Sequence, residues 1–172
     1  MKQQKITTKK LVLTALFTAL IMVATLFVRI PLANGYVNLG DAFIFASTIV
    51  LGPFWGTIAA AFGSAIADTI GYIVYAPATF LIKGGMAILF WLVYQALLKA
   101  IHSEFWATII AGVVGTAFMT FGYFVFEAFF ITSVPLAILN APWTLLQGGV
   151  GVAVAIVLLR VLKATKLMER FR

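Results

Sequence analysis

A lysine lies inside an apolar stretch that is long enough to cross a bilayer. The segment from Ala78 to Leu98 has the sequence ATFLIKGGMAILFWLVYQALL, and Lys83 is its one charged residue. A charge at the centre of a bilayer costs at least about 2.5–3.5 kcal/mol, so such residues usually pair, line a cavity or serve function. Asp68 and Glu127 lie in similar apolar surroundings. These groups could hold a polar ligand, or Lys83 could form a purely structural ion pair with one of the two acids.

Uncharged polar and aromatic side chains accompany these charges. Asn140, Trp143 and Gln147 have i, i+3 and i+7 spacing, which places them on one helix face, and Tyr123 lies one turn from Glu127. Amides can fix the polar edges of a planar ligand while aromatic rings stack on it. The pattern therefore predicts a site for a small, polar, ring-bearing solute. The alternative for Trp143 and the tyrosines is an ordinary place in the aromatic belt of a membrane protein.

Composition places the chain among multi-pass membrane proteins. Of its 172 residues 63% are hydrophobic and only 10% are charged, against about 25% in soluble domains. Twelve Lys and Arg against five Asp and Glu give a net charge of +7, but most of the cations lie near the termini, so membrane topology explains them better than nucleic-acid binding. Cysteine is absent, which excludes disulfides and thiolate chemistry. We expect no enzyme activity, cofactor or metal site.

The hydrophobic segments predict an all-α fold. Proline, glycine and polar clusters divide the chain into six segments that form one integral membrane domain over residues 1–172. We expect a bundle of six transmembrane helices at Leu11–Val28, Leu39–Leu51, Phe54–Val74, Thr79–Leu98, Phe105–Ile131 and Ala141–Leu162. The second helix is short, since at 1.5 Å per residue it covers only about 20 Å. The first segment is too long for a secretory signal and is expected to be a retained span.

The distribution of cations predicts the orientation. With both termini in the cytoplasm, nearly all lysines and arginines fall inside, Arg29 falls outside and Lys83 lies within the membrane. Lys83, Asp68, Glu127 and Gln147 then lie in the outer half of the bundle, whereas the inner half is almost wholly apolar. This asymmetry predicts a cup that opens outward and is sealed below. A standalone secondary carrier or channel is the alternative function, although it would need polar groups at every depth.

One acid receives a structural interpretation instead. Asp41 follows Asn38-Leu39-Gly40 at the start of the second segment, where a carboxylate can accept hydrogen bonds from free backbone amides. We therefore predict that Asp41 is the N-cap of the second helix.

The order of several short motifs resembles a known family. The stretch YVNLGDAFIFASTIVLGPFWGTIAAAFGSAIADTIGY, followed by APATFLIKGG, is similar to the substrate-binding S components of energy-coupling factor (ECF) vitamin transporters. The resemblance covers nearly the whole chain. Within the family it is strongest to members proposed for pyridoxine or hydroxymethylpyrimidine, and pantothenate members come next.

The resemblance implies partners and a mechanism. It implies a multi-pass protein of the prokaryotic plasma membrane that captures a vitamin outside, works with a transmembrane coupling protein (the T component) and two ATP-binding-cassette ATPases, and topples in the membrane to release the vitamin. Ala15 and Ala19 match the family's AxxxA motif, which faces the coupling protein. The family's pocket region assigns substrate binding to Lys83, Glu127, Asn140, Trp143 and Gln147, with Asn38, Tyr36 and Tyr75 from loops. Asp68 and Tyr123 complete the candidate set by their predicted depth.

Overall fold

The computed structural model describes residues 8–31 and 36–165, which form a helical bundle with one small β-hairpin. The helices are α1 (Thr8–Phe27), α2 (Gly40–Leu51), α3 (Pro53–Thr69), α4 (Ala76–Ile101), α5 (Glu104–Phe126) with the π-helical turn η1 (Glu127–Ile131), and α6 (Val134–Ala164). The strands β1 (Arg29–Pro31) and β2 (Tyr36–Asn38) are antiparallel, with Ile30 opposite Val37.

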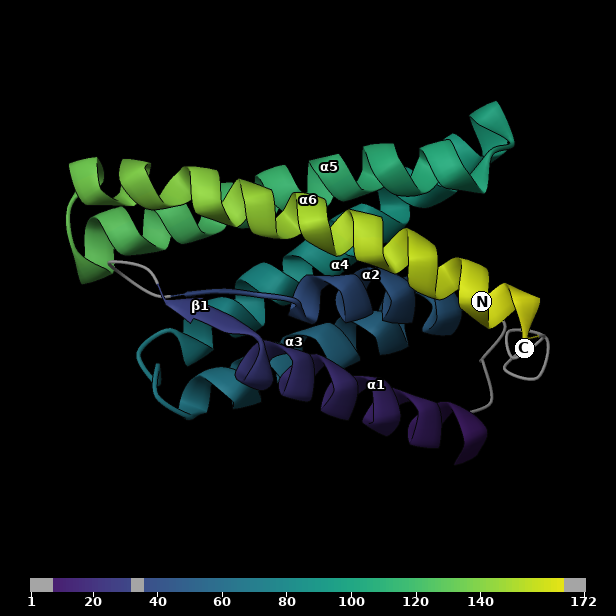
Figure 1. The fold of residues 1–172 in the computed structure, drawn as a ribbon, viewed down its shortest axis with the longest axis horizontal. Coiled ribbons are helices and arrows are strands. Elements are labelled where there is room, and N and C mark those ends of the chain that lie inside the picture. Colours follow the sequence, from purple (N-terminus) through teal and green to yellow (C-terminus); the bar gives the residue numbers. More distant parts are fainter. Residues whose placement is uncertain (1–7, 32–35, 166–172) are drawn as a thin grey trace.

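The helices lie roughly along the long axis of the molecule, with the short helix α2 in the middle (Figure 1). α4 packs against α3 and α5, α1 packs against α3, and α2 contacts α1, α3 and α6. Most residues of α2 are buried. The short second helix is therefore confirmed, and it is a central element surrounded by longer neighbours.

The long helices are suited to a bilayer. α1, α4, α5 with η1, and α6 are long and apolar enough to cross a membrane, whereas α2 and α3 have 12 and 17 residues. Many large apolar side chains point outward from the bundle, for example Leu81, Phe121 and Val157. Lipid rather than water is the solvent that such a surface requires. The number of complete spans stays a prediction.

The two ends of the bundle differ in charge. α1 begins and α6 ends at the same end of the molecule, where the connection between α4 and α5 also lies, and the hairpin lies at the opposite end (Figure 1). Lys9 and Lys10 lie in the first turn of α1, Lys99 and Lys163 lie in the last turns of α4 and α6, and Arg160 lies just before the last turn of α6. We refer to this end as the basic end and to the other as the hairpin end.

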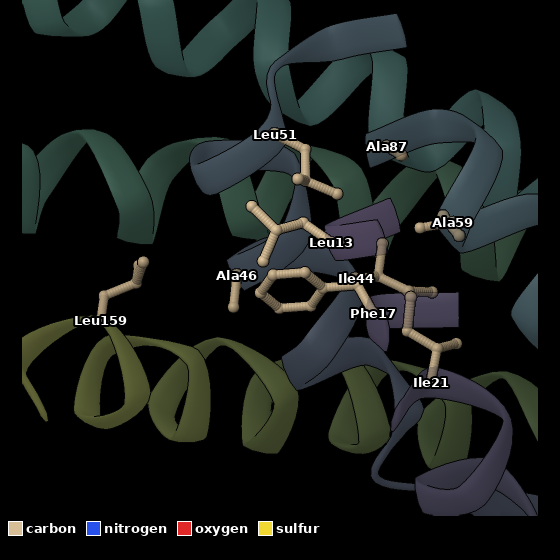
Figure 2. Packing of buried hydrophobic residues seen from close by; sticks show 10 residues of the cluster. Leu13, Phe17, Ile21, Ile44, Ala46, Leu51, Ala59, Ala87 and Leu159 are labelled. Carbon is tan, nitrogen blue, oxygen red and sulfur yellow. The ribbon is translucent and has the colours of Figure 1, made fainter. Parts of the chain in front are cut away.

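A hydrophobic cluster near the basic end joins α1 to its neighbours (Figure 2). Leu13, Phe17 and Ile21 recur every four residues on one face of α1, and they pack with Ile44 of α2 and with residues of α3, α4 and α6. Burying such side chains contributes about 1.5–3 kcal/mol each in water, and within lipid the close packing itself supplies most of the gain. This cluster fixes α2 in the bundle.

Several helix boundaries differ from the prediction. α3 ends at Thr69 rather than Val74, because Gly71 adopts a left-handed backbone conformation with φ of 100° and turns the chain. α6 begins at Val134, seven residues before the predicted start at Ala141, with a proline in its first turn. Proline is favoured there, because that turn has amide groups without intrahelical partners. Pro142, which suggested the boundary, lies inside α6.

Arg29 attaches the hairpin to the bundle. Its guanidinium donates to the carbonyls of Ala67 (2.8 Å) and Ile70 (2.9 Å) at the end of α3, and to Thr25 O (3.1 Å). The last carbonyls of a helix have no intrahelical donors and carry partial negative charge, so a cation is stabilising there. The all-α prediction omitted this hairpin, whose strands of three residues are too short to give a pattern in the sequence.

Candidate functional site: a polar cavity beneath the hairpin

A polar cavity lies at the hairpin end, enclosed by side chains from every helix except α2 and from strand β2. Its volume is about 510 Å³ when its open mouth is included. It is lined by Thr25, Tyr36, Asn38, Ser64, Asp68, Tyr75, Thr79, Lys83, Tyr123, Glu127, Asn140, Thr144 and Gln147. Every predicted substrate-binding residue except Trp143 is in this set. Residues up to 122 positions apart in the sequence therefore meet in one place.

The base of the cavity is a buried charge pair between α4 and α2. Lys83 forms an ion pair with Asp41, and both side chains are almost wholly inaccessible. Lys83 Nζ also lies 2.9 Å from Met119 Sδ, and Gln147 Nε2 donates to Asp41 Oδ2 at 2.6 Å. A buried charge is tolerated when it is paired and hydrogen-bonded in this way. Lys83 is therefore partnered, but by neither of the acids that the sequence suggested.

Asp41 corrects the prediction for the second helix. The residue at the N-cap position of α2 is Leu39, with no side-chain capping bond, and Asp41 lies inside the first turn, fully buried. Its carboxylate points across the bundle to Lys83 and Gln147. The signal was present in the sequence, because an acid within the apolar run GDAFIFAS needs a partner as much as Lys83 does.

Gln147 connects the base of the cavity to the hairpin. While its amide nitrogen donates to Asp41, its amide oxygen accepts from the backbone N–H of Asn38 at 2.9 Å. Asn38 in turn accepts from Gly40 N through Oδ1 at 2.8 Å. One side chain of α6 thus holds both the start of α2 and the end of β2.

A second polar group forms around Asp68 on α3. Both of its oxygens accept hydrogen bonds, one from the hydroxyl of Tyr36 and the other from Thr79 at 2.5 Å, and Thr79 lies 3.0 Å from the hydroxyl of Tyr123. Burial, and after it the charge of Asp68, raises the pKa of Tyr36. Tyr36 therefore remains protonated at physiological pH and serves as the donor to Asp68.

Glu127 enters the cavity where α5 becomes a π-helical turn. It is the first residue of η1, and the wider turn re-orients the side chains that follow, a feature frequent at functional sites. The Glu127 side chain is 5% exposed, and Asn140 Nδ2 of α6 donates to its Oε2 at 2.9 Å. The predicted proximity of Glu127 and Asn140 is therefore observed.

The residues that line the cavity differ from the predicted set at Trp143 and at four small hydroxyl residues. Trp143 is 49% exposed on the outer side of α6 and does not line the cavity. Four residues that were not predicted line the cavity: Thr25, Ser64, Thr79 and Thr144. Small hydroxyl residues are common packing residues in membrane helices, so nothing in the sequence distinguishes these four.

Towards the basic end, apolar packing lies beneath the cavity. Phe45, Met86, Phe90 and Met119 are fully buried in one hydrophobic cluster formed by α2, α4, α5 and α6, and Met119 of this cluster contacts Lys83. Lys83 lines the cavity, and its partner Asp41 lies behind it; that the cup is sealed towards the cytoplasm stays a prediction.

A helical membrane protein with a polar cavity at one end and apolar packing beneath that cavity is suited to hold a small solute. Comparison with known proteins gives the family. Residues 5–164 match the family model of the S component of ECF-type riboflavin transporters, and the chain belongs to this family. It is therefore a multi-pass protein of the cell membrane. The family is one of transport subunits rather than enzymes, and ECF S components work with a T component and ATPases.

Two individual proteins are similar. A solved structure described as the S component of a bacterial ECF transporter has a TM-score of 0.69, with 22% identity over 91% of this chain and 96% of that chain, which shows the shared fold. A Pyrococcus woesei protein described as "Uncharacterized protein in gap 3'region" is 44% identical over 66 residues, which are 37% of this chain. That alignment spans 45% of the Pyrococcus protein's length.

Proposed function

We propose that this chain is the substrate-specificity subunit of an ATP-driven vitamin importer. As a single domain with six spans and both termini in the cytoplasm, it binds its ligand from outside in the cavity beneath the hairpin. The observation that carries this proposal is the convergence of nine predicted polar side chains on one cavity that has apolar packing beneath it.

The proposed ligand is a small ring-bearing vitamin or vitamin precursor. Pyridoxine and hydroxymethylpyrimidine are favoured, and pantothenate comes next. Tyr36, Tyr75 and Tyr123 offer aromatic faces, while Asn38, Asn140 and other polar groups offer hydrogen bonds to ring substituents. Riboflavin is a further candidate, since it is the ligand in the description of the family model.

The proposed coupling surface lies on α1. Ala15 and Ala19 are both exposed, one turn apart, so their small side chains leave room for another helix to approach closely. We propose that the T component binds here and that two ATP-binding-cassette ATPases supply the energy.

A ligand screen tests the binding function. The purified protein is incubated with pyridoxine, hydroxymethylpyrimidine, pantothenate or riboflavin, and thermal unfolding is followed in detergent. A ligand at about 100 times its Kd should stabilise the folded state by about 2.7 kcal/mol. If no vitamin stabilises the protein or is taken up by cells that also produce the partner subunits, the proposal is wrong.

Transport by the chain alone separates this function from that of a standalone carrier. Proteoliposomes that contain only this protein receive the ligand found in the screen together with proton or sodium gradients. A specificity subunit should bind the ligand without accumulating it, whereas a secondary carrier would concentrate it inside.

A further inference from the structure

The charges around the cavity do not balance, and this imbalance bears on the ligand. Besides Lys83, the site contains three acids from three different helices: Asp41, Asp68 and Glu127. Lys83 is paired with Asp41 and so is already neutralised. Asp68 and Glu127 then remain as acids in a buried site, held by neutral donors.

The nearest other cation does not neutralise them by direct contact. Arg29 uses its guanidinium on three backbone carbonyls, and the same group lies 4.4 Å from the ring centroid of Tyr36. Among the described residues, the hydrogen-bond donors to Asp68 are the hydroxyls of Tyr36 and Thr79, and the donor to Glu127 Oε2 is an amide.

Both acids are held by neutral groups. The two oxygens of Asp68 accept from hydroxyl groups, while Glu127 accepts from Asn140 through Oε2 and also interacts with the Tyr75 hydroxyl. A carboxylate has about four acceptor positions, so Glu127 retains capacity for a further donor. The buried hydroxyl of Ser64 also lines the cavity without a hydrogen-bond partner among the described residues, so it too is available to a ligand.

We propose that the ligand carries a protonated nitrogen that binds Glu127, and that the cavity discriminates against vitamins bearing a carboxylate. This inference rests on the proposed function and narrows it. In a buried site a ligand cation is stabilised mainly by an opposite charge in direct contact, whereas a ligand carboxylate would meet the acids Glu127 and Asp68. The tyrosine rings add favourable faces for a cation.

A series of ligands with one ring tests the charge preference on the unmodified protein. Pyridoxamine, pyridoxine and 4-pyridoxate share a pyridine ring and differ in one substituent, which is an ammonium, an alcohol or a carboxylate. Hydroxymethylpyrimidine, pantothenate and riboflavin are measured beside them by thermal shift and calorimetry. The pyridine nitrogen is common to all three, so the comparison reports on the substituent that differs. We expect pyridoxamine to bind most tightly of the three, and 4-pyridoxate to bind at least about tenfold more weakly than pyridoxamine, which corresponds to 1.4 kcal/mol.

The variant Glu127→Gln tests the residue. It keeps the shape and an acceptor oxygen but removes the charge, so affinity for the tightest cationic ligand should fall at least about tenfold. Glu104→Gln is the matched control, because Glu104 lies at the other end of the same helix, paired with Lys163, and should leave affinity unchanged.

The outcomes are distinct. Tightest binding of pantothenate, 4-pyridoxate or riboflavin would refute the charge preference and leave the vitamin-binding function intact. Unchanged affinity in folded Glu127→Gln would mean that Glu127 acts as a neutral acid, which also refutes the inference. Should Glu127→Gln fail to fold, the ligand series alone decides. Absence of binding by every ligand would contradict the proposed function itself.

Discussion

Lys83 and Asp41 illustrate how strongly one residue can depend on another in this protein. Each is buried, and each is the other's charged partner. A pair of this kind adds little net stability compared with apolar residues, but the removal of one partner leaves the other as an isolated buried charge. Lys83 is therefore important mainly because it neutralises the buried charge of Asp41.

Lys83→Met should lower the free energy of unfolding by about 3–5 kcal/mol, since it leaves the Asp41 carboxylate without its cation. The double variant Lys83→Met/Asp41→Asn should recover a large part of that loss, because the remaining amide is neutral and can still bond to Gln147. Denaturation in detergent measures all variants, with Asp41→Asn as the second single change. Strictly additive effects would contradict the coupling of the pair.

Trp143 is expected to be unnecessary for binding. Its ring lies on the exposed side of α6, outside the cavity, so Trp143→Phe should change ligand affinity by less than about twofold, as is usual for substitutions away from special features. Calorimetry with the ligand identified in the screen provides the measurement. Asn140→Leu, one turn away and inside the cavity, is the contrast and should weaken binding markedly. A large loss in Trp143→Phe would place the indole in the site after all.

The close contact between α5 and α6 depends on Gly148, which has no side chain. A Cβ atom at Gly148 would lie 2.2 Å from Cγ2 and Oγ1 of Thr116, whereas a Cβ atom at Gly149 would meet nothing within 4 Å. Glycines at such positions let helix backbones approach closely. Gln147, which bridges Asp41 and Asn38, is the residue directly before this contact.

Gly148→Ala should therefore destabilise the protein by about 1–3 kcal/mol, as over-packing does elsewhere. Gly149→Ala is a closely matched control on the next residue and should be neutral or slightly stabilising, since alanine is the better helix former. Thermal unfolding of the two variants checks both statements. Equal stability of the two would mean that α5 and α6 can separate without cost.

In the described part of the molecule, the outward surface of the long helices is largely apolar, which suits a protein whose helices contact lipid. Most exposed side chains of the long helices are apolar. On α1, Ala15 and Ala19 add a small-residue surface that a second membrane protein can approach.

Ala15→Trp and Ala19→Trp should abolish vitamin uptake, because a large ring at either position prevents a helix of the partner from packing on α1. Ligand affinity should not change, since neither residue lines the cavity. Ala153→Trp makes the same change on an exposed part of α6 and serves as the control. Uptake is measured in cells that contain the partner subunits, and affinity is measured on purified protein. Normal uptake by both α1 variants would remove this surface from the proposed interface.

The sequence by itself determined the membrane class, the helical fold, the short second helix and the group of residues around the cavity. These properties are local or depend only on depth: hydropathy selects the segments, and the position of Lys83, Glu127 or Gln147 along a helix gives its level in the bilayer.

Tertiary structure alone decided which groups touch. Helix rotation and axial offset bring Lys83 to Asp41 rather than to Asp68 or Glu127, turn Trp143 outward, and let Gln147 join α2 to the hairpin. Partners lie as far as 109 residues apart in the chain. Such contacts depend on the packing of all the helices together, because a rotation of one helix by a single residue, about 100°, would replace every partner of its polar face.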